Sequence, residues 1–235
     1  MRKFIRKIIG DAGTKNLLSR QEWVEKKLCE IKNGSKILDA GAGEQQYRKF
    51  CSHLDYTSQD FNEYKGIGNH EGLQTGVWDT SKTDIVSDIL SIPIEKNSFD
   101  VILCTEVFEH IPNPIAAIDE FYRLLKPGGI LIVTAPFNSL THFAPYHYYS
   151  GFSKYFYEYF FPKAGFKITE LIPNGDYSEY IGQEVRRIRK IYNKSPFLVN
   201  IALTLILRFI NKNKTKVKTS DLGCFGYHIV AYKEI

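Results

Sequence analysis

The chain has 235 residues, of which 43% are hydrophobic and 24% are charged, and its net charge is +5. This composition is typical of a soluble globular protein with one sizeable core. It excludes a fibrous or disordered chain. The four cysteines form no C-x-x-C pair, which excludes a zinc knuckle and indicates reduced thiols in a cytoplasmic protein. No apolar stretch reaches the roughly 20 residues of a membrane-spanning helix, and the first residues do not form a secretory signal.

The first predicted element is a helix that begins at the capping box Ser19-Arg-Gln-Glu22 and ends at Asn33-Gly34. Trp23, Val24 and Leu28 follow the box at helical spacing. We expect this helix to pack on a sheet and to help cover a ligand site. Residues 1–35 are therefore predicted to form an N-terminal helical cap.

The next segment, KILDAGAG over residues 36–43, predicts an apolar strand that leads into a glycine turn. Residues 45–50 are predicted to form the helix that follows, which gives the geometry of a nucleotide-binding crevice. There is no third glycine, because Gln45 stands where G-x-G-x-G would place one. Asp39 and Glu44 would repel a pyrophosphate, so the turn favours a cationic ligand, S-adenosylmethionine (SAM), over a dinucleotide.

Further motifs follow in order, and together with residues 36–43 they resemble class I SAM-dependent methyltransferases. They are YTSQD at 56–60, VSDI at 86–89, FDVILC at 99–104, LKPGGILIV at 125–133 and AGF at 164–166. The resemblance implies an α/β, Rossmann-like, seven-stranded and mostly parallel sheet with an antiparallel last strand. It places the SAM-binding core at 36–171, a helical insert at 172–225 and the final strand at 226–235. Asn113-Pro114 predicts the start of a core helix that runs to about Leu125.

The same resemblance implies which residues bind SAM. Asp60 would hold the ribose hydroxyls, and Asp88 is favoured over its neighbour Asp84 for the adenine edge because the apolar segment Ile89–Pro93 follows it. Phe61 would either stack on adenine or belong to the core. The full predicted set is Asp39, Ala40, Gly41, Gly43, Asp60, Phe61, Asp88, Ile89, Cys104 and Glu106.

After the fourth predicted strand, Glu106, Glu109 and His110 form E-x-x-E-H, with three oxygen or nitrogen donors near one helical face. A similar pattern binds a divalent metal in ubiquinone-pathway O-methyltransferases and in small-RNA 3′-terminal methyltransferases, where a later histidine joins it. Here His142 or His147 would take that place. Many small-molecule methyltransferases carry the pair without a metal, and Glu109 and His110 could also simply cap a helix. Without a metal, His110, His142 and His147 are the candidate bases for a hydroxyl acceptor.

Residues 143–161 contain eleven aromatic side chains that could line an acceptor pocket. Phe152, Phe156 and Tyr159 recur at helical spacing and are predicted to be core. This stretch and GAGEQQYRKF at 41–50 resemble methyltransferases of bacterial envelope-glycan and lipid pathways. The resemblance implies a small-molecule, sugar or lipid-linked acceptor. An RNA methyltransferase and a non-catalytic SAM-binding module are the alternatives, and the sequence leaves the oligomeric state open.

The last distinctive segment, residues 186–218, carries ten lysines and arginines and no acid, so the rest of the chain is net acidic. This segment overlaps a region at 177–211 that is predicted to be helical. Leu198, Ile201, Leu205 and Phe209 form an apolar stripe flanked by basic residues. A solvated helix face, peripheral contact with the inner face of a membrane, and nucleic-acid binding are the three interpretations, in that order. The start of the chain, residues 2–9, is amphipathic in the same way.

Overall fold

A computed structural model describes residues 10–192, 196–213 and 219–234. The chain divides into two compact units. The core unit consists of Glu22–Ile172 and Gly226–Ile235, and the helical unit consists of Met1–Gln21 and Pro173–Phe225. The division between Ile172 and Pro173 lies one residue after the predicted start of the helical insert. The predicted cap at 1–35 is instead divided between the two units, and its amphipathic start lies outside the described residues.

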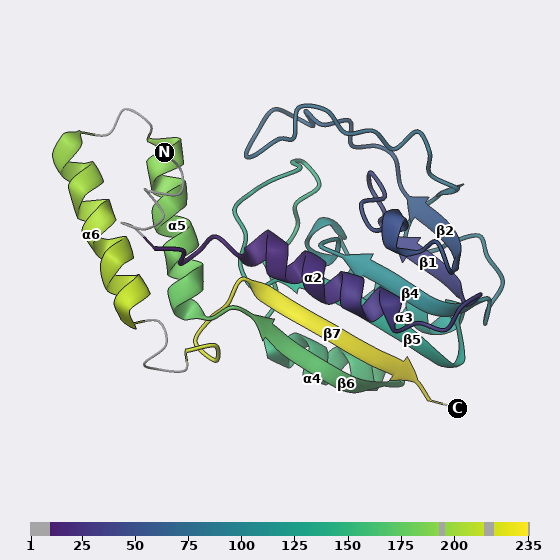
Figure 1. Cartoon of the computed structure of the whole chain (residues 1–235). Helices are drawn as coiled ribbons and strands as arrows, with labels where there is room; N and C mark the ends of the chain where they lie inside the picture. The colour runs from purple at the N-terminus through teal and green to yellow at the C-terminus, as the bar shows by residue number, and fades with distance from the viewer. Residues whose placement is uncertain (1–9, 193–195, 214–218, 235) are drawn as a thin grey trace. The chain divides into compact units, whose positions relative to one another are not determined.

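The core unit is built on a seven-stranded sheet in the order β3-β2-β1-β4-β5-β7-β6 (Figure 1). Strand β1 pairs in parallel with β2 and β4, whereas β7 runs antiparallel to β5. This confirms the predicted fold class. The strands are β1 Lys36–Ala40, β2 Asp55–Asp60, β3 Ile85–Val86, β4 Phe99–Thr105, β5 Leu125–Pro136, β6 Phe166–Asn174 and β7 Gly226–Lys233.

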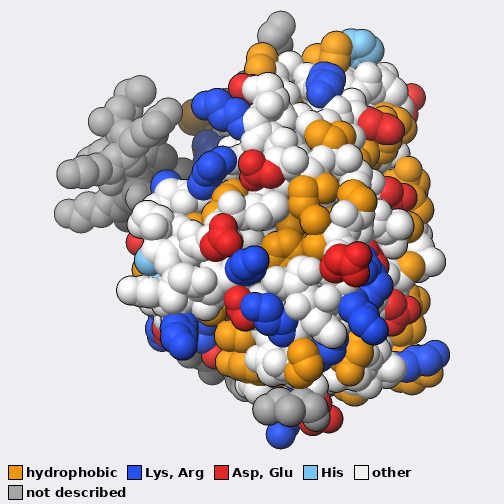
Figure 2. All heavy atoms as spheres, turned by 90° about the vertical axis from the view of Figure 1, so that its right-hand side faces the viewer, with side chains coloured by type: hydrophobic (Ala, Val, Ile, Leu, Met, Phe, Trp, Pro, Cys, Tyr) orange, Lys and Arg blue, Asp and Glu red, His pale blue; other side chains and the backbone are white. Residues whose placement is uncertain are grey.

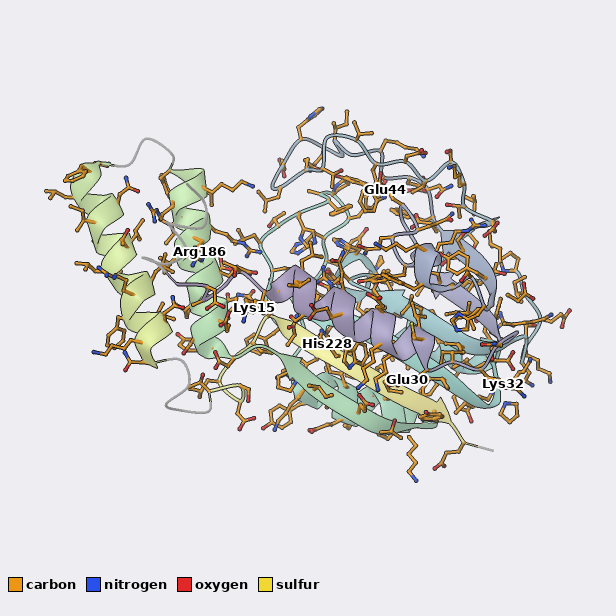
Figure 3. All side chains as sticks on the ribbon, in the orientation of Figure 1. Lys15, Glu30, Lys32, Glu44, Arg186 and His228 are labelled. Carbon is orange, nitrogen blue, oxygen red and sulfur yellow. The ribbon has the colours of Figure 1, made fainter. Side chains whose placement is uncertain are left out.

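Helix α2 (Asn16–Cys29) packs on this sheet, as predicted. Its Val24 and Leu28 are fully buried in one cluster with strand residues such as Ile37. Trp23 stacks on His228 of β7 with ring centroids 4.7 Å apart, and Figure 3 labels this histidine. The helix begins three residues before the predicted cap and ends at Cys29, several residues before the predicted Asn33-Gly34 stop. The Ser19 hydroxyl bonds to backbone carbonyls of the first turn instead.

Two shorter helices flank the strands of the core unit. Helix α3 (Pro114–Leu124) has the predicted cap, because the Asn113 side chain accepts a hydrogen bond from Ala116 N at 3.2 Å. Helix α4 (Lys154–Lys163) buries Tyr157 and Phe161, whereas Tyr159 is 61% exposed. The prediction of Tyr159 as core is wrong, because the helix turns a different row of aromatic side chains inward.

The prediction of a helix over residues 45–50 is also wrong. The chain forms turns there and then the single 3-10 turn η1 (Arg48–Phe50). The second 3-10 turn, η2 (Phe108–His110), follows β4. In both places the chain that leaves the carboxyl end of a strand keeps an irregular backbone.

The helical unit contains α5 (Tyr177–Ile191) and α6 (Phe197–Asn213), which lie side by side and antiparallel in Figure 1. The predicted helical region is therefore two helices. Leu203 and Leu207 of α6 are buried together with Val185 of α5. Within the same unit, the Arg186 guanidinium of α5 donates to the carbonyls of Gly10 and Ala12. None of the helices in the described parts of the chain is long and apolar enough to cross a membrane.

The surface of the molecule is mixed on the face drawn in Figure 2, where acidic and basic side chains alternate around hydrophobic ones. A shallow depression at the amino edge of the sheet is lined by residues that include Glu30, Asp100 and Lys126. Asp100 is already occupied by Lys126 at 2.7 Å and by the backbone N–H of Lys36 at 2.8 Å. The predicted site residues instead follow the carboxyl ends of the parallel strands.

Candidate functional site

The carboxyl edge of the parallel strands gathers the residues that the sequence singled out. Gly41 follows β1, Asp60 ends β2, Asp88 follows β3 and Glu106 follows β4. These four strands are neighbours in the sheet and run parallel, so their carboxyl ends lie at one edge. Such an edge, where the strand order reverses beside β1, is where open α/β sheets bind ligands.

The turn after β1 is tied to the end of β2 by its own backbone. The N–H groups of Gly41 and Ala42 both donate to the carbonyl of Gln59 at 2.9 Å, and the Gly43 N–H donates to Asp60 Oδ2 at 2.9 Å. Gly41 and Gly43 have φ values of 71° and 51°, which glycine adopts without strain. A Cβ on Gly43 would lie 2.5 Å from Cζ2 of Trp78. This position is therefore closed to any side chain.

Gln45 preserves the conformation that a third glycine would have. Its φ is 56°, in the left-handed region. The amide of its side chain donates to the Lys82 carbonyl at 2.7 Å and to Ser58 Oγ at 3.1 Å. These bonds offset the cost of about 1 kcal/mol that a non-glycine residue bears there. The turn thus keeps its shape although the motif departs from the family pattern.

Asp60 is placed to hold both the turn and a ligand. Its side chain is 7% exposed. Oδ2 accepts from Gly43 N, and Oδ1 accepts from Asn62 N at 3.0 Å. A carboxylate offers about four acceptor positions, so these two bonds leave capacity for the ribose hydroxyls. The ribose contact stays a prediction.

Asp39 points into the protein interior. It is 2% exposed, and Oδ2 accepts a 2.6 Å hydrogen bond from the Tyr56 hydroxyl. Burial raises the pKa of this carboxyl to about 7; the Tyr56 bond opposes the rise, and the nearby Asp60 charge adds to it. The adjacent Ala40 is also fully buried. The contacts of these two residues with SAM stay predictions.

The two acids near β3 have different surroundings. Asp84 accepts from both the backbone N–H and the hydroxyl of Ser58, at 2.9 and 2.6 Å, which gives it a role in joining the strands. Asp88 is exposed and accepts only the Leu90 N–H at 2.9 Å among the contacts described for its side chain. Ile89 beside it is 9% exposed. The choice of Asp88 as the adenine-edge residue stays a prediction.

Sequence reasoning missed an aromatic cluster that stands over the glycine turn. The irregular segment between β2 and β3 carries Trp78 and Tyr64, and both rings contact Phe143, with centroids 5.0 and 4.4 Å away. The segment is fixed to the turn by the Asp79 N–H, which donates to Glu44 at 3.2 Å; Figure 3 labels this glutamate. The signal in the sequence was a tryptophan in an otherwise polar, glycine-rich stretch.

Phe61 follows Asp60 at the end of β2. It is 38% exposed, and its ring meets Tyr146 edge to face with centroids 4.9 Å apart. The interpretation of Phe61 as a core residue does not hold, because a core ring would be covered. Its stacking on adenine stays a prediction.

Three histidines, His110, His142 and His147, come together at this edge although His110 is far from the other two in the sequence. The rings of His110 and His142 are 4.6 Å apart, and those of His142 and His147 are 4.9 Å apart. His110 Nδ1 lies 2.5 Å from the Tyr146 carbonyl. Since a carbonyl only accepts, Nδ1 carries the proton and Nε2 presents a lone pair. Burial lowers the pKa of His110 to about 3, helped by the neighbouring His142.

The other two histidines are held by the loop that carries them. His142 Nδ1 donates to the Leu140 carbonyl at 2.8 Å, and His147 Nε2 lies 3.1 Å from Ser139 Oγ. The pKa of His147 is also lowered, by burial and by His142. His142 therefore turns its Nε2 away from its own backbone and toward Glu109.

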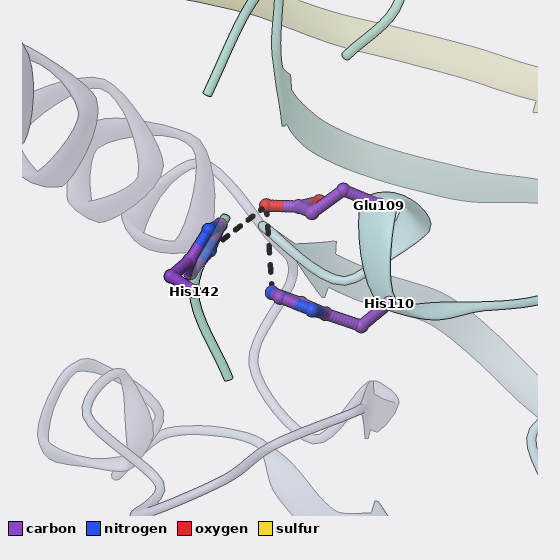
Figure 4. Close-up of side chains that lie close together, drawn as sticks. All are labelled: Glu109, His110 and His142. Atoms are coloured by element: carbon purple, nitrogen blue, oxygen red, sulfur yellow. Dashed lines mark ion pairs between the residues drawn. The ribbon is translucent and has the colours of Figure 1, made fainter. Parts of the chain in front are cut away.

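Glu109 completes the group. It is 1% exposed, and its Oε1 lies 3.8 Å from His110 Nε2 and 3.9 Å from His142 Nε2 (Figure 4). The ligand atoms of these three residues all lie within 4.8 Å of one another, so they fit around a divalent ion. Two of the candidate ligands predicted from the sequence, Glu106 and His147, are not in this group. Glu106 Oε1 accepts from Thr134 Oγ1 at 3.0 Å. Metal binding by any of these residues stays a prediction.

Cys104 and Glu106 were also predicted to face SAM. The Cys104 side chain is completely buried in β4, as the sequence indicated for a strand end, so only its backbone can reach a ligand. Glu106 has a φ of 55°, which is rare for a residue with a side chain. Its backbone N–H donates to the Thr134 carbonyl at 2.8 Å. The strained residue sits where β4 opens into the histidine cluster, the kind of place where strain accompanies function.

Known proteins are similar to this chain in sequence and in fold. Residues 38–133 match the methyltransferase domain family. A ubiquinone biosynthesis O-methyltransferase from Xylella fastidiosa is 30% identical over 116 residues, which are 47% of this chain and 46% of that protein. The counterpart from Actinobacillus pleuropneumoniae is 32% identical over 105 residues, which are 42% and 44% of the two chains. The match thus spans slightly less than half the length of these relatives.

Solved structures extend the likeness in fold to nearly the whole chain. An Archaeoglobus fulgidus SAM-dependent methyltransferase has a TM-score of 0.57 at 16% identity and covers 98% of both chains. Haemonchus contortus phosphoethanolamine N-methyltransferase 2, solved with SAM, has a TM-score of 0.53 at 19% identity over 92% of this chain and 52% of that one. The chain therefore has the fold of these SAM-dependent methyltransferases. The [4+2]-cyclase SpnF, with a TM-score of 0.58 at 17% identity over 95% and 84%, has the same fold.

The methyltransferase domain allows a direct test of the glycine turn. Gly43→Ala should weaken SAM binding by roughly tenfold or more, because the new Cβ would push on Trp78 and the backbone would be strained. Gly34→Ala is the matched control, since Gly34 has a φ of 77° and open space around its Cβ position. Calorimetry should show that Gly34→Ala leaves SAM affinity unchanged. If Gly43→Ala bound SAM like the parent protein, the turn would not be part of the site.

The buried Asp39 predicts a pH dependence of stability. Its pKa is near 7 in the folded protein and about 3.9 in the unfolded chain, so the folded state holds the extra proton between these values. This contribution is fully present below about pH 4 and is lost as the pH rises through 7, at up to about 1.4 kcal/mol per pH unit. Asp39→Asn should therefore gain stability relative to the parent between pH 5 and 8. Urea unfolding of both at several pH values measures it, and a pH-independent difference would contradict the assignment.

Proposed function

We propose that the chain transfers a methyl group from SAM to a hydroxyl group of a small, sugar or lipid-linked acceptor. The observation that carries the proposal is His110, which stands beside the end of β4 with Nδ1 bound to the Tyr146 carbonyl and Nε2 unprotonated. This is the state a general base needs at neutral pH. The methyltransferase domain and the O-methyltransferase relatives support the same reaction.

In the proposed step, the acceptor oxygen attacks the sulfonium methyl in line with the C–S bond. The new O–CH3 bond forms as the CH3–S bond breaks, and the electron pair goes to sulfur, which leaves S-adenosylhomocysteine. The hydroxyl proton goes to His110 Nε2. A weak base is enough, because the methylated oxygen is a strong acid until it loses that proton. Positioning supplies most of the rate, since SAM is already activated.

The acceptor class rests on what surrounds the histidines. Phe61, Trp78, Phe143 and Tyr146 provide aromatic surface at the same edge, which suits an apolar or sugar ring stacked against it. We favour a sugar or lipid-linked sugar of polysaccharide biosynthesis, with the protein in the cytoplasm and peripheral at the inner face of the membrane. The ubiquinone biosynthesis relatives support a hydroxyl on a small or lipid-bearing molecule.

Two other functions remain as alternatives, and an acceptor screen distinguishes them from the proposed one. An RNA methyltransferase would show salt-dependent RNA affinity. In this chain, however, the basic segment belongs to the helical unit and the histidines belong to the core unit. A non-catalytic SAM-binding module would bind SAM and turn over no acceptor. A screen of hydroxyl acceptors that measures S-adenosylhomocysteine release separates the three.

His110→Asn should lower kcat by about 10²–10⁴ while SAM affinity stays unchanged, because the proton acceptor is lost but no predicted SAM contact is. His70→Asn is the matched control, since His70 is an exposed loop histidine with a φ of 68° that Asn also adopts. The control should keep full activity. A His110→Asn enzyme with parental kcat would rule out the base assignment.

The metal interpretation is tested separately. We expect full activity in excess chelator, because the sulfonium needs no Lewis acid and Glu106, the first residue of the E-x-x-E-H set, is bound to Thr134. Loss of activity with chelator, and recovery with added divalent metal, would instead assign Glu109, His110 and His142 as ligands. His147 would then be the residue to test for a fourth ligand.

A further inference from the structure

Helix α6 carries apolar side chains on opposite faces. One face is buried, where Leu203 and Leu207 pack with Ile181 and Val185 of α5. The other face is open within the helical unit. It presents Leu198, Ile201, Leu205 and Phe209, which are 76%, 41%, 57% and 69% exposed. Their spacing of three and four residues places them in one row, and the structure thus confirms the stripe that the sequence predicted.

Basic side chains lie along this exposed row. Arg208 and Lys212 of α6 are exposed and belong to the same turns as Phe209. Residues 186–218 contain no acidic residue at all. An apolar row with basic side chains and no acid on its own helix is the pattern of a helix that lies in a membrane interface, where long basic side chains reach the headgroups.

The charge decides which occupant fits the row. A second copy of the chain would bring two cationic faces together, and like charges across an interface are unfavourable. An anionic lipid surface complements the row and takes up its apolar side chains. The helix lies in such a surface rather than crossing the bilayer, because none of the described helices is long and apolar enough to span it.

We propose that α6 docks the protein on an anionic membrane, with Leu198, Ile201, Leu205 and Phe209 entering the interface and Arg208 and Lys212 at lipid phosphates. This deepens the proposed function, on which its link to a lipid-linked acceptor rests. Docking itself requires no methyl transfer. Vesicle binding that is unchanged in His110→Asn would separate the two.

The test is co-sedimentation of the full chain with vesicles of phosphatidylcholine alone or of equal parts phosphatidylcholine and phosphatidylglycerol. We expect binding to the anionic vesicles at about 0.05 M salt and much less at about 0.5 M, because salt screens the attraction. Arg208→Gln with Lys212→Gln should weaken it by about thirtyfold at low salt. Changing Leu198, Leu205 and Phe209 together to Gln should weaken it by at least about tenfold.

Matched controls change equally exposed residues elsewhere. Leu17 and Leu18 of α2 are 53% and 54% exposed, and Leu17→Gln with Leu18→Gln should leave vesicle binding unchanged. Lys65→Gln with Lys96→Gln, two exposed lysines of the core unit, should do the same. Thermal unfolding shows whether each variant is folded. For a triple variant that fails to fold, the Arg208 and Lys212 variant decides.

Three results would overturn the proposal. The first is no binding to anionic vesicles at low salt. The second is binding that the control variants reduce as much as the α6 variants do. The third is a parent protein that is dimeric by light scattering and becomes monomeric with the α6 triple change, without vesicle binding in either form. That last result would make the row a contact between copies of the chain.

Discussion

The candidate site depends on one joint in the backbone, between the turn after β1 and the end of β2. Two N–H groups of the turn share the Gln59 carbonyl, and a third binds the carboxylate of Asp60. Asp60 therefore fixes the turn with one carboxylate oxygen, and its carboxylate lies beside the turn as a hydrogen-bond acceptor for a ligand. If these hydrogen bonds broke, the turn would lose its shape and Asp60 would lose its orientation. The proposed SAM site depends on both.

The histidine cluster depends on a second, looser connection. The loop over residues 138–150 is tied to η2 because the N–H groups of Tyr148 and Tyr149 donate to the Glu109 carbonyl, at 2.9 and 3.2 Å. His110 in turn is oriented by the Tyr146 carbonyl. The loop over residues 138–150 thus orients His110, and η2, which contains His110, in turn binds the loop. The candidate site residues thus lie on irregular backbone that the strands of the sheet hold in position, as in other α/β proteins.

Much of this follows from the sequence, because strand ends and glycine turns leave strong local signals. The KILDAGAG turn, Asp60 at the end of β2 and the Asn113 cap were predicted at their observed positions. Long-range contacts leave no such signal. The partner of Asp39 is Tyr56 and the partner of Glu106 is Thr134, and no spacing rule indicates either pair.

The sequence predictions that the structure contradicts, and the residue that they missed, have physical explanations as well. The helix expected at 45–50 does not form, because Gln45 takes a left-handed φ and its amide bonds across to Ser58 and Lys82. Tyr159 is exposed because helical spacing alone cannot choose between two aromatic rows on one helix. Trp78 was missed because a long irregular segment carries no periodicity, and only the fold brings it to Gly43.

The most direct test of the account is SAM binding by Asp60→Ala, measured by calorimetry beside Asp55→Ala. Asp60 and Asp55 are opposite ends of β2, so only the first lies at the proposed site. The account predicts a loss of roughly 1.5–3 kcal/mol for Asp60→Ala, or about tenfold or more in affinity, and none for Asp55→Ala. Equal SAM affinity in the parent protein and Asp60→Ala would contradict it.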